Sequence, residues 1–346
     1  MRFDPGTRHG RASLGTLFCV LLLSACGGGG GGSSGGGTDN GTSPVTDDVM
    51  ASASVQDLCV APRAATVRDE DGRPYPDRAG TRRNELDWVR GWIDETYLWY
   101  RDVRGLAVAT RSAANYSDPV AYFDLLKSPV LTASGKPRDA YHFTYNTADW
   151  VNLIGAGQEL GYGMTVVFSG WTRPRSAVVA FTQEGSTAAT AGITRGQQIV
   201  MVDGVDLVNG SDEWAIYNGL FPSATGWHTL QLRDPSTGIT RSATVQAALV
   251  SLVPVHNVKT LPSPNQTVGY LQFDDHLATA EPLLVAAFRQ LAAAGVTDLV
   301  LDMRYNGGGY LAIASEVAYM VAGPARTSGK VFERSITNDR DRKSVV

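Results

Sequence analysis

The segment from Val268 to Gly323 switches between two periodicities, and this switching constrains the fold more than any other feature. Two short apolar runs, "VGYLQF" and "TDLVLDMR", are typical of buried strands. The stretches "AEPLLVAAFRQLAAAG" and "YLAIASEVAYMVAG" instead carry apolar residues at helical spacing, and Gly295 is suited to end the first of them. The order strand, helix, strand, helix predicts a βαβ crossover with a parallel strand pair, and therefore an α/β core.

The region before this core predicts helices. In "NELDWVRGWIDETYLWY", residues 84–100, apolar side chains recur every three or four positions, and Asn84 is a candidate N-cap. A second helix is expected over 118–126, with Asp118 as cap and Pro119 in the first turn. The aromatic residues of the first stretch have the spacing of packing residues, although a ligand cage is the alternative.

Residues 155–250 have a third texture. Short β-type runs such as "GMTVVF", "SAVVAFT" and "HTLQLRD" are separated by Gly and Pro clusters, and one helical stretch, "SDEWAIYNGLF", lies among them. This pattern predicts a compact, β-rich domain of its own.

The first 26 residues are expected to be a targeting segment. Basic residues precede "LGTLFCVLLLSA", an apolar run that is short for a membrane span. The end of this run, "LLSAC", resembles the lipobox of bacterial lipoproteins, which implies lipidation of Cys26; an ordinary secretory signal is the alternative. The family's sorting rules then imply the outer membrane, facing the periplasm. The Gly/Ser-rich residues 27–56 are expected to be a tether.

Charge and cysteines exclude some classes. The net charge of −4 is dispersed, which argues against a nucleic-acid partner. Of the three cysteines, Cys19 and Cys26 lie in the targeting segment, so we expect Cys59 to be unpaired.

Part of the β-rich region resembles PDZ domains, which bind protein C-termini. The resemblance rests on Ala191-Gly192-Ile193, on "GQQI" at 196–199 and on "VDG" at 202–204; Gln197 stands where an Asp is usual. It implies that an extended peptide adds to a strand edge while backbone amides hold its carboxylate. The implied carboxylate loop is "GYGM", which comprises Gly161, Tyr162, Gly163 and Met164. A simple tight turn is the alternative there.

The run "LVLDMRYNGGGYLA", residues 299–312, places three glycines where a strand meets a helix. A dinucleotide loop is disfavoured, because the later glycines of that pattern and a P-loop lysine are absent. The residues alone are compatible with two further interpretations, a simple tight turn and an oxyanion hole built from exposed backbone amides.

This run resembles the Asp-Leu-Arg-x-Asn-x-Gly-Gly motif of the C-terminal processing (tail-specific) serine peptidases. The resemblance implies that Gly308 donates its N–H to the oxyanion, with Gly309 next in line, while Gly307 shapes the turn. Three polar residues would hold the loop in place: Asp302, Arg304 and Asn306. The motif "SGKPRDAYHFTY", the PDZ signature and "VGYLQF" occur in the family's order, so the resemblance covers most of the chain after the leader.

The resemblance also implies a serine nucleophile and a buried, neutral lysine base. The serines after Gly309 are Ser315, Ser328, Ser335 and Ser344, and the lysines are Lys330 and Lys343. None has the family's arrangement. We therefore expect the chain to end before the nucleophile and to be inactive as given; a family member that lost catalysis is the alternative.

The motif "FDDH", residues 273–276, places two carboxylates beside an imidazole, as a metal site or a proton relay would. The other histidines lack ligand spacing, so a polar strand end is favoured, and we expect no metal and no cofactor.

Together these patterns predict an α/β protein that acts as a tail-specific serine endopeptidase on protein or peptide C-termini. A non-catalytic PDZ lipoprotein, acting as an adaptor, is the alternative. The expected divisions are a signal peptide (1–26), a tether (27–56), a helical region (57–154), a PDZ domain (155–250) and the first part of the peptidase core (251–346).

Overall fold

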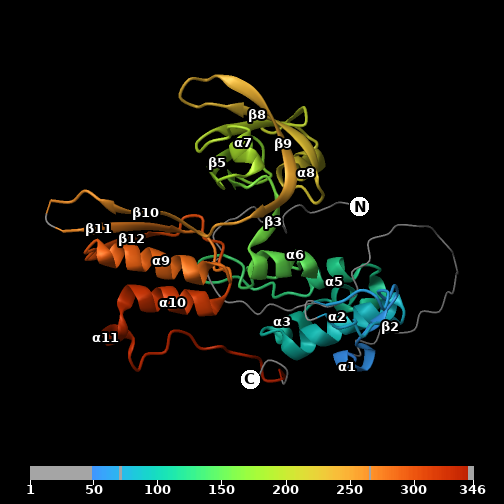
Figure 1. Ribbon diagram of the computed structural model, residues 1–346. Helices are drawn as coiled ribbons and strands as arrows, with labels where there is room; N and C mark the ends of the chain where they lie inside the picture. The colour runs from blue at the N-terminus through green and yellow to red at the C-terminus, as the bar shows by residue number, and fades with distance from the viewer. Residues whose placement is uncertain (1–48, 70–71, 265, 342–346) are drawn as a thin grey trace. The chain divides into compact units, whose positions relative to one another are not determined.

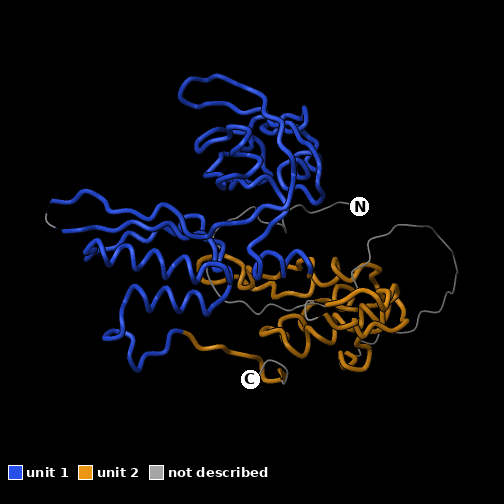
Figure 2. The backbone as a smooth tube through the Cα atoms, viewed as in Figure 1, with its two compact units in different colours: residues 1–20, 148–332 blue, residues 21–147, 333–346 orange. Residues whose placement is uncertain are grey.

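The computed structural model describes residues 49–69, 72–264 and 266–341. Within these residues the chain divides into two compact units (Figure 2). One unit comprises residues 148–332. The other comprises residues 49–147 together with 333–341, so the end of the described chain belongs with its beginning.

The second unit is built mainly from short helices (Figure 1). They are α1 (Ser52–Val55), α2 (Arg82–Thr96), α3 (Tyr100–Arg104), α4 (Val108–Arg111), the 3-10 turn η2 (Ala113–Asn115) and α5 (Pro119–Leu125). The short strands β1 (Leu58–Cys59) and β2 (Arg78–Ala79) pair in parallel. Buried apolar residues of α2, α3 and α5 form one core, among them Leu86, Ile93 and Tyr122.

Helix α2 begins earlier than the sequence predicted. Thr81, not Asn84, is the N-cap: its hydroxyl accepts a bond from the Asn84 N–H, and the Asn84 side chain accepts one from the Thr81 N–H. The predicted N-cap is therefore the third residue of a capping box. The prediction for the later helix is confirmed, because Asp118 caps α5 and Pro119 is its first residue.

The charged segment 333–341 packs into the helical unit. The Asn338 amide donates to the Tyr97 carbonyl at 2.8 Å, and Arg340 forms an ion pair with Asp94. Asn338 is buried although the local sequence carries no fold signal. The segment is therefore positioned by contacts with residues that are distant in the sequence.

Cys59 is disulfide-bonded, so the prediction of an unpaired Cys59 is wrong. That prediction set Cys19 and Cys26 aside as leader residues, which removed every possible partner within the chain.

The first unit opens with α6 (Thr147–Val151) and the π-helical turn η3 (Asn152–Ala156) and continues into a seven-stranded sheet. Its strands are β3 (Gln158–Gly161), β4 (Met164–Phe168), β5 (Ala177–Thr182), β6 (Gln198–Val202), β7 (Val205–Asp206), β8 (Gly226–Arg233) and β9 (Thr240–Ser251). The strand order is β3-β9-β8-β6-β5-β4, with β7 on β6. Strand β4 is therefore an edge.

Two helices complete this part, which we call the seven-stranded module (residues 158–251). They are α7 (Thr187–Thr190) and α8 (Glu213–Leu220), and α8 lies against β6 and β7. One apolar core runs through the module, contributed by side chains such as Ile199, Leu230 and Val245. The predicted β-rich texture with a single longer helix is found here.

The remaining part of the first unit has a three-stranded sheet of order β10-β11-β12. Its elements are β10 (Val255–Leu261), β11 (Val268–Phe273), α9 (Ala280–Ala293), β12 (Asp298–Asp302), α10 (Leu311–Ala322) and α11 (Pro324–Thr327). Strands β11 and β12 are parallel, which confirms the predicted crossover, and β10 joins antiparallel. Helix α9 lies against β10 and α10 lies against α9 (Figure 1). The α/β prediction is confirmed.

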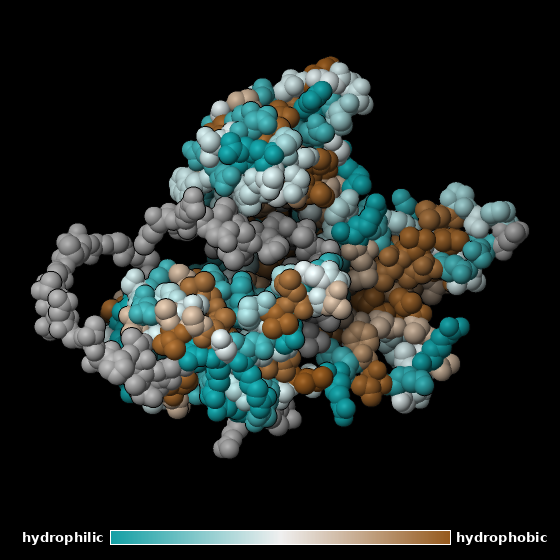
Figure 3. Space-filling model, turned by 180° about the vertical axis from the view of Figure 1, so that it is seen from behind, coloured by the Kyte–Doolittle hydropathy of each residue, from teal (hydrophilic) through white to brown (hydrophobic). Residues whose placement is uncertain are grey.

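Strand β12 is one edge of the three-stranded sheet, and β10 is the other. Within the described residues it pairs only with β11, and Val300 and Met303 at this edge are more than one-third exposed. Figure 3 shows hydrophobic surface over the part of the molecule that holds this sheet and its helices.

Candidate functional site

The glycine loop that follows β12 is bound along its length to the segment that follows β11. The Gly307 N–H donates to the Asp274 carbonyl at 2.8 Å, and the Tyr310 N–H donates to the His276 carbonyl at 2.8 Å. In return the His276 N–H donates to the Gly308 carbonyl at 2.6 Å. The motif "FDDH" therefore continues β11 as a backbone support for the loop.

This pairing decides which glycine amide is exposed. In a trans peptide the carbonyl and the following N–H point in opposite directions. Because the Gly308 carbonyl faces His276, the Gly309 N–H faces away from the supporting segment, and no described group accepts it. The Gly308 N–H instead donates to the Asn306 side chain at 2.9 Å. Of the two predicted donors, the geometry favours Gly309.

Two of the three glycines are required by the backbone, and the third lies against a side chain. Gly308 and Gly309 have φ of +88° and +129°, which side chains disfavour. A Cβ on Gly309 would lie 2.4 Å from the His276 carbonyl oxygen. A Cβ on Gly307 would lie 2.7 Å from the Asp275 carboxylate. Close approach of the two segments, rather than loop flexibility, explains the run of glycines.

A carboxylate anchors the start of the loop. Asp302 accepts hydrogen bonds from both the side chain and the backbone N–H of Arg304, and from the Tyr270 hydroxyl at 2.5 Å. The Arg304 guanidinium, followed by the Tyr270 hydroxyl, holds the pKa of the Asp302 carboxyl well below its usual range, although burial opposes this effect. The hydrogen bond to the Asp302 carboxylate in turn raises the pKa of the Tyr270 hydroxyl.

Asn306 is the second anchor of the loop. Its side-chain amide donates to the Phe273 carbonyl at 3.0 Å in the interior, while its oxygen accepts the Gly308 N–H. One buried side chain thus joins β11 to the glycine loop. The structure brings the predicted residues Asp302, Arg304 and Asn306 into this loop, and their role in activity stays a prediction.

Two groups that the sequence interpretation did not assign also belong to the site. Tyr270 on β11 completes the shell of Asp302, because the parallel pairing of β11 with β12 brings the two strands side by side. His276 supports the loop through its backbone, and burial lowers the pKa of its imidazole. The βαβ pattern in the sequence could have identified both residues, because it places the ends of β11 and β12 next to each other.

A metal centre is not formed in this region. Within residues 49–69, 72–264 and 266–341, no group of three or more His, Cys, Asp and Glu side chains is placed to hold a metal ion. In the "FDDH" motif, Asp274 pairs with His256 at 3.1 Å and accepts bonds from the Gln272 amide.

The loop 161–164 uses the same backbone device in the seven-stranded module. The Tyr162 carbonyl accepts the Ala188 N–H, and the Gly163 carbonyl accepts the Gln183 N–H. Both carbonyls therefore face the interior, so the N–H groups of Gly163 and Met164 face outward, at the start of the edge strand β4. Gly163 allows this turn with φ of +70°. Two adjacent outward amides can hold an anion.

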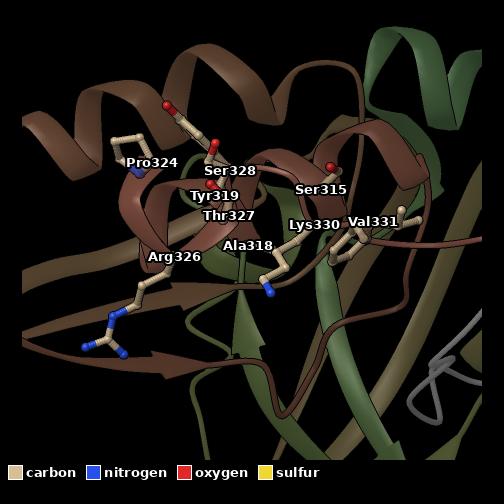
Figure 4. Close-up of a pocket in the computed structure, with 10 residues that line it drawn as sticks. Ser315, Ala318, Tyr319, Pro324, Arg326, Thr327, Ser328, Lys330 and Val331 are labelled. Atoms are coloured by element: carbon tan, nitrogen blue, oxygen red, sulfur yellow. The ribbon is translucent and has the colours of Figure 1, made fainter.

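A pocket of about 590 Å³ lies between α10, α11 and the residues after them (Figure 4). It brings together Ser315, Ser328 and Lys330. Lys330 is exposed, whereas a lysine that acts as a base must be kept neutral by burial. In Figure 4 its amine points away from both hydroxyls. These residues therefore do not form a nucleophile and base in contact.

Residues 267–344, which contain β11, β12 and the glycine loop, match the model of peptidase family S41. This part of the chain is a peptidase family S41 domain. A carboxyl-terminal-processing protease of Picosynechococcus sp. PCC 7002 is 32% identical over 135 residues, which are 39% of this chain and 32% of that protein. The protease of the same name from Synechocystis sp. PCC 6803 is 31% identical over 134 residues, 39% of this chain and 31% of that protein.

The S41 domain is therefore homologous to carboxyl-terminal-processing proteases, and the chain spans about a third of the length of these curated relatives. Among solved structures, a putative S41 protease from Bacteroides fragilis is similar with a TM-score of 0.39 and 23% identity, covering 72% of this chain and 60% of that one. A photosystem II D1 C-terminal processing protease gives 0.39 and 22%, covering 70% and 65%.

Proposed function

We propose that this chain carries the oxyanion loop and the substrate-binding module of a tail-specific serine endopeptidase. The observation that carries the proposal is the outward N–H of Gly309 at the end of β12, inside the segment that matches family S41. A preorganised amide at a strand end stabilises a carbonyl oxygen as it becomes negative. Among the described residues after Gly309, no serine and lysine are placed as the nucleophile and base of this chemistry.

The proposed reaction is acyl transfer. A serine hydroxyl attacks the scissile carbonyl carbon while a neutral lysine accepts its proton. The carbonyl oxygen becomes an oxyanion, and the Gly309 N–H and the amide of the nucleophile donate to it. Collapse of this intermediate breaks the peptide bond, and the lysine returns the proton to the leaving amine. Water then releases the acyl group in a second attack of the same kind.

The seven-stranded module supplies recognition in this proposal. Its outward amides at Gly163 and Met164 bind the terminal carboxylate of a protein, and the free edge of β4 pairs with the preceding residues. Residues 191–204 carry the PDZ-like signature in the same module. Amidation of the peptide C-terminus should therefore weaken binding, because the amides lose their anion.

Activity provides the test of the oxyanion assignment. The 346-residue chain should leave peptides uncut, whereas a version extended by its downstream coding sequence should cleave them. In the extended chain, replacing residue 309 with glycolic acid removes one N–H but keeps the glycine backbone. We expect a loss of about 3 kcal/mol of transition-state stabilisation, roughly a hundredfold or more in rate.

The matched control is the same replacement at residue 308, which removes only the bond to Asn306. It should cost less activity. A larger loss at 308 than at 309 would reverse the assignment of the donor. Proline is unsuitable at either position, because its φ near −65° is incompatible with +88° and +129°.

A non-catalytic adaptor is the second candidate, and one observation favours it. The serines and lysine near the glycine loop do not contact each other in a buried site. The coding sequence after Val346 distinguishes the two candidates. A serine in a small-residue turn with a lysine about one helix later supports the enzyme, and a stop codon supports the adaptor.

We also propose that the protein is lipid-anchored at Cys26 and faces the periplasm from the outer membrane. No helix among the described residues is both long and apolar enough to cross a membrane, and the targeting residues lie outside that described part. Cys26→Ser should release the protein into the soluble periplasm. A lipidated Cys26 is unavailable for a disulfide, so mapping the partner of Cys59 gives an independent check.

A further inference from the structure

A chain of polar side chains leads from β10 to the segment that supports the glycine loop. The Asn257 amide donates to the Gln272 Oε1 at 2.9 Å, and the Gln272 amide donates to both oxygens of the Asp274 carboxylate, at 3.0 and 3.2 Å. His256 Nε2 lies 3.1 Å from the same carboxylate. The donors therefore point along the chain in one direction, and the chain ends at Asp274.

Strand β10 is irregular where it contributes to this network. Its register against β11 shifts between His256 and Lys259, as at a β-bulge, and Asn257 has φ of +55°. Asparagine tolerates this conformation better than most residues. Neighbouring residues of a regular strand point to opposite faces, and a bulge changes the direction of one of them. The irregularity therefore lets His256 and Asn257 both contribute to one network.

Asp274 connects the network to the glycine loop. Its backbone N–H donates to the Pro254 carbonyl at 2.9 Å, and its carbonyl accepts the Gly307 N–H at 2.8 Å. The residue is 1% exposed, so its carboxylate depends on Gln272 and His256 in place of water. A displacement of this carboxylate would also displace the carbonyl that holds Gly307.

Another His–Asp pair in the chain shows why burial matters here. In the seven-stranded module His228 Nδ1 lies 2.7 Å from Asp203, and the side chains of His228 and His256 are both 20% exposed. The side chain of Asp203 is 39% exposed, whereas that of Asp274 is 1% exposed. Water can replace the imidazole at Asp203. At Asp274 the loss of the imidazole would leave a buried carboxylate with an empty partner position, which is costly.

We propose, resting on the proposed oxyanion role of Gly309, that His256 is a positioning residue for the glycine loop. Its imidazole holds the Asp274 carboxylate, and the Asp274 carbonyl in turn holds Gly307 and the peptide groups that follow. His256 does not touch the substrate. It fixes the place of the Gly309 N–H, and this place matters because a displacement of about 1 Å in an active site can cost up to a hundredfold in rate.

Hydrogen exchange on the 346-residue chain tests the positioning step without any catalysis. His256→Leu removes the partner of the buried carboxylate, and we expect the amides of Gly307 and Tyr310 to exchange about tenfold faster than in wild type. The amides of α9 and of the seven-stranded module should keep their rates. His256→Gln places an amide N–H near the position of Nε2 and should restore most of the protection.

Two further variants serve as controls for the exchange experiment. His228→Leu removes the same kind of partner from an exposed carboxylate and should leave the exchange of the Gly307 amide unchanged. Asn257→Gly keeps the positive φ but loses the donor to Gln272, and we expect about threefold faster exchange at Gly307. Asn257 is exposed, so this second variant also tests the network if His256→Leu does not fold.

Kinetics of the chain extended by its downstream coding sequence test the consequence for catalysis. We expect His256→Leu to lower kcat about tenfold while KM changes little, because the loop acts on the transition state and not on substrate binding. His256→Gln should recover kcat to within about threefold of wild type, since it restores a donor to the carboxylate. A residue that only stabilises the fold would lower the active fraction without this recovery.

The outcomes separate the positioning role from the proposed function. A folded His256→Leu chain with wild-type exchange at Gly307, or with equally faster exchange at all amides, would contradict the positioning role. Faster loop exchange with wild-type kcat in the extended chain would show that His256 has no effect on catalysis, and would also overturn the proposal. An extended wild-type chain that cuts no peptide would refute the proposed function, while the exchange data would still decide whether His256 positions the loop.

Discussion

The loops 161–164 and 306–309 present outward N–H groups by the same means and are supported by different chemistry. In each, a carbonyl is drawn inward by a neighbouring segment, and the following N–H is forced outward. Beneath the first loop lies an aromatic ring in an apolar core. The second is held by the buried side chains of Asn306 and Asp302.

The comparison separates what the backbone needs from what the side chains supply. A glycine at a turned position is required in both loops, because each position has a positive φ and leaves no room for a Cβ. The polar anchors are required only in the second loop, where hydrogen bonds to buried groups replace packing. Glycine substitutions should therefore affect both loops, and polar substitutions only one.

The largest effect is expected from adding a Cβ at the turned glycines. Gly309→Ala and Gly163→Ala each combine a positive φ with a Cβ that would lie 2.4 Å and 2.3 Å, respectively, from its nearest neighbour. Each should destabilise the fold by about 3 kcal/mol, the sum of backbone strain and overpacking. Urea unfolding of the full chain measures this.

Gly161→Ala is the matched control. Its Cβ would meet nothing within 4 Å, and its φ is outside the positive region. Because glycine in a strand is less favourable than alanine, the change should be neutral or stabilising by up to about 1 kcal/mol. Equal losses at 161 and 163 would show that the two positions do not differ as described.

Asn306 should give the next largest effect, restricted to the second loop. Asn306→Ala removes the donor to the Phe273 carbonyl and the acceptor of the Gly308 N–H, leaving a buried carbonyl unpaired. We expect a loss of about 2–3 kcal/mol of folding stability. Hydrogen exchange should report faster exchange at the Gly308 amide while the amides of the seven-stranded module keep their protection.

Asn306→Asp refines the test, because a carboxylate still accepts the Gly308 N–H but cannot donate to Phe273. It should also destabilise, since it leaves the same buried carbonyl unpaired. Wild-type stability in Asn306→Ala would mean that the bonds of this side chain contribute nothing to the loop.

The sequence predicted the location of both loops but not the direction of their amides. The glycines, the alternating periodicity and the strand-to-helix junction are local signals, so the βαβ unit and its loop could be predicted. Which N–H is exposed depends on whether His276 pairs with Gly308 or with a neighbour. That register is set by long-range strand pairing, which a single sequence does not carry, so the sequence alone does not decide between the amides of Gly308 and Gly309.

The predicted start of helix α2 was wrong for a related reason. Asn84 is a good cap by composition, yet Thr81 is the cap because the pair forms a box that starts the helix earlier. The sequence of segment 333–341 gives no signal for its place in the fold, because its partners, such as Tyr97 and Asp94, lie more than two hundred residues away. Local sequence propensity does not include such long-range contacts, so it cannot predict where the segment packs.

The smallest effect, and the most specific for the polar loop, is the pH dependence of Asp302. Because Arg304 and Tyr270 lower the folded pKa below 3.8, the carboxylate stabilises the fold fully above its unfolded pKa of about 3.9. This contribution is lost as the pH falls through the folded pKa. The stability difference between wild type and Asp302→Asn should therefore be constant from pH 7 to 5 and become smaller below about pH 4.

Tyr270→Phe keeps the Arg304 pair and should show a smaller stability difference from wild type over the same pH range. A difference that stays constant down to pH 2, measured by urea unfolding, would mean that the anchor does not depend on the charge.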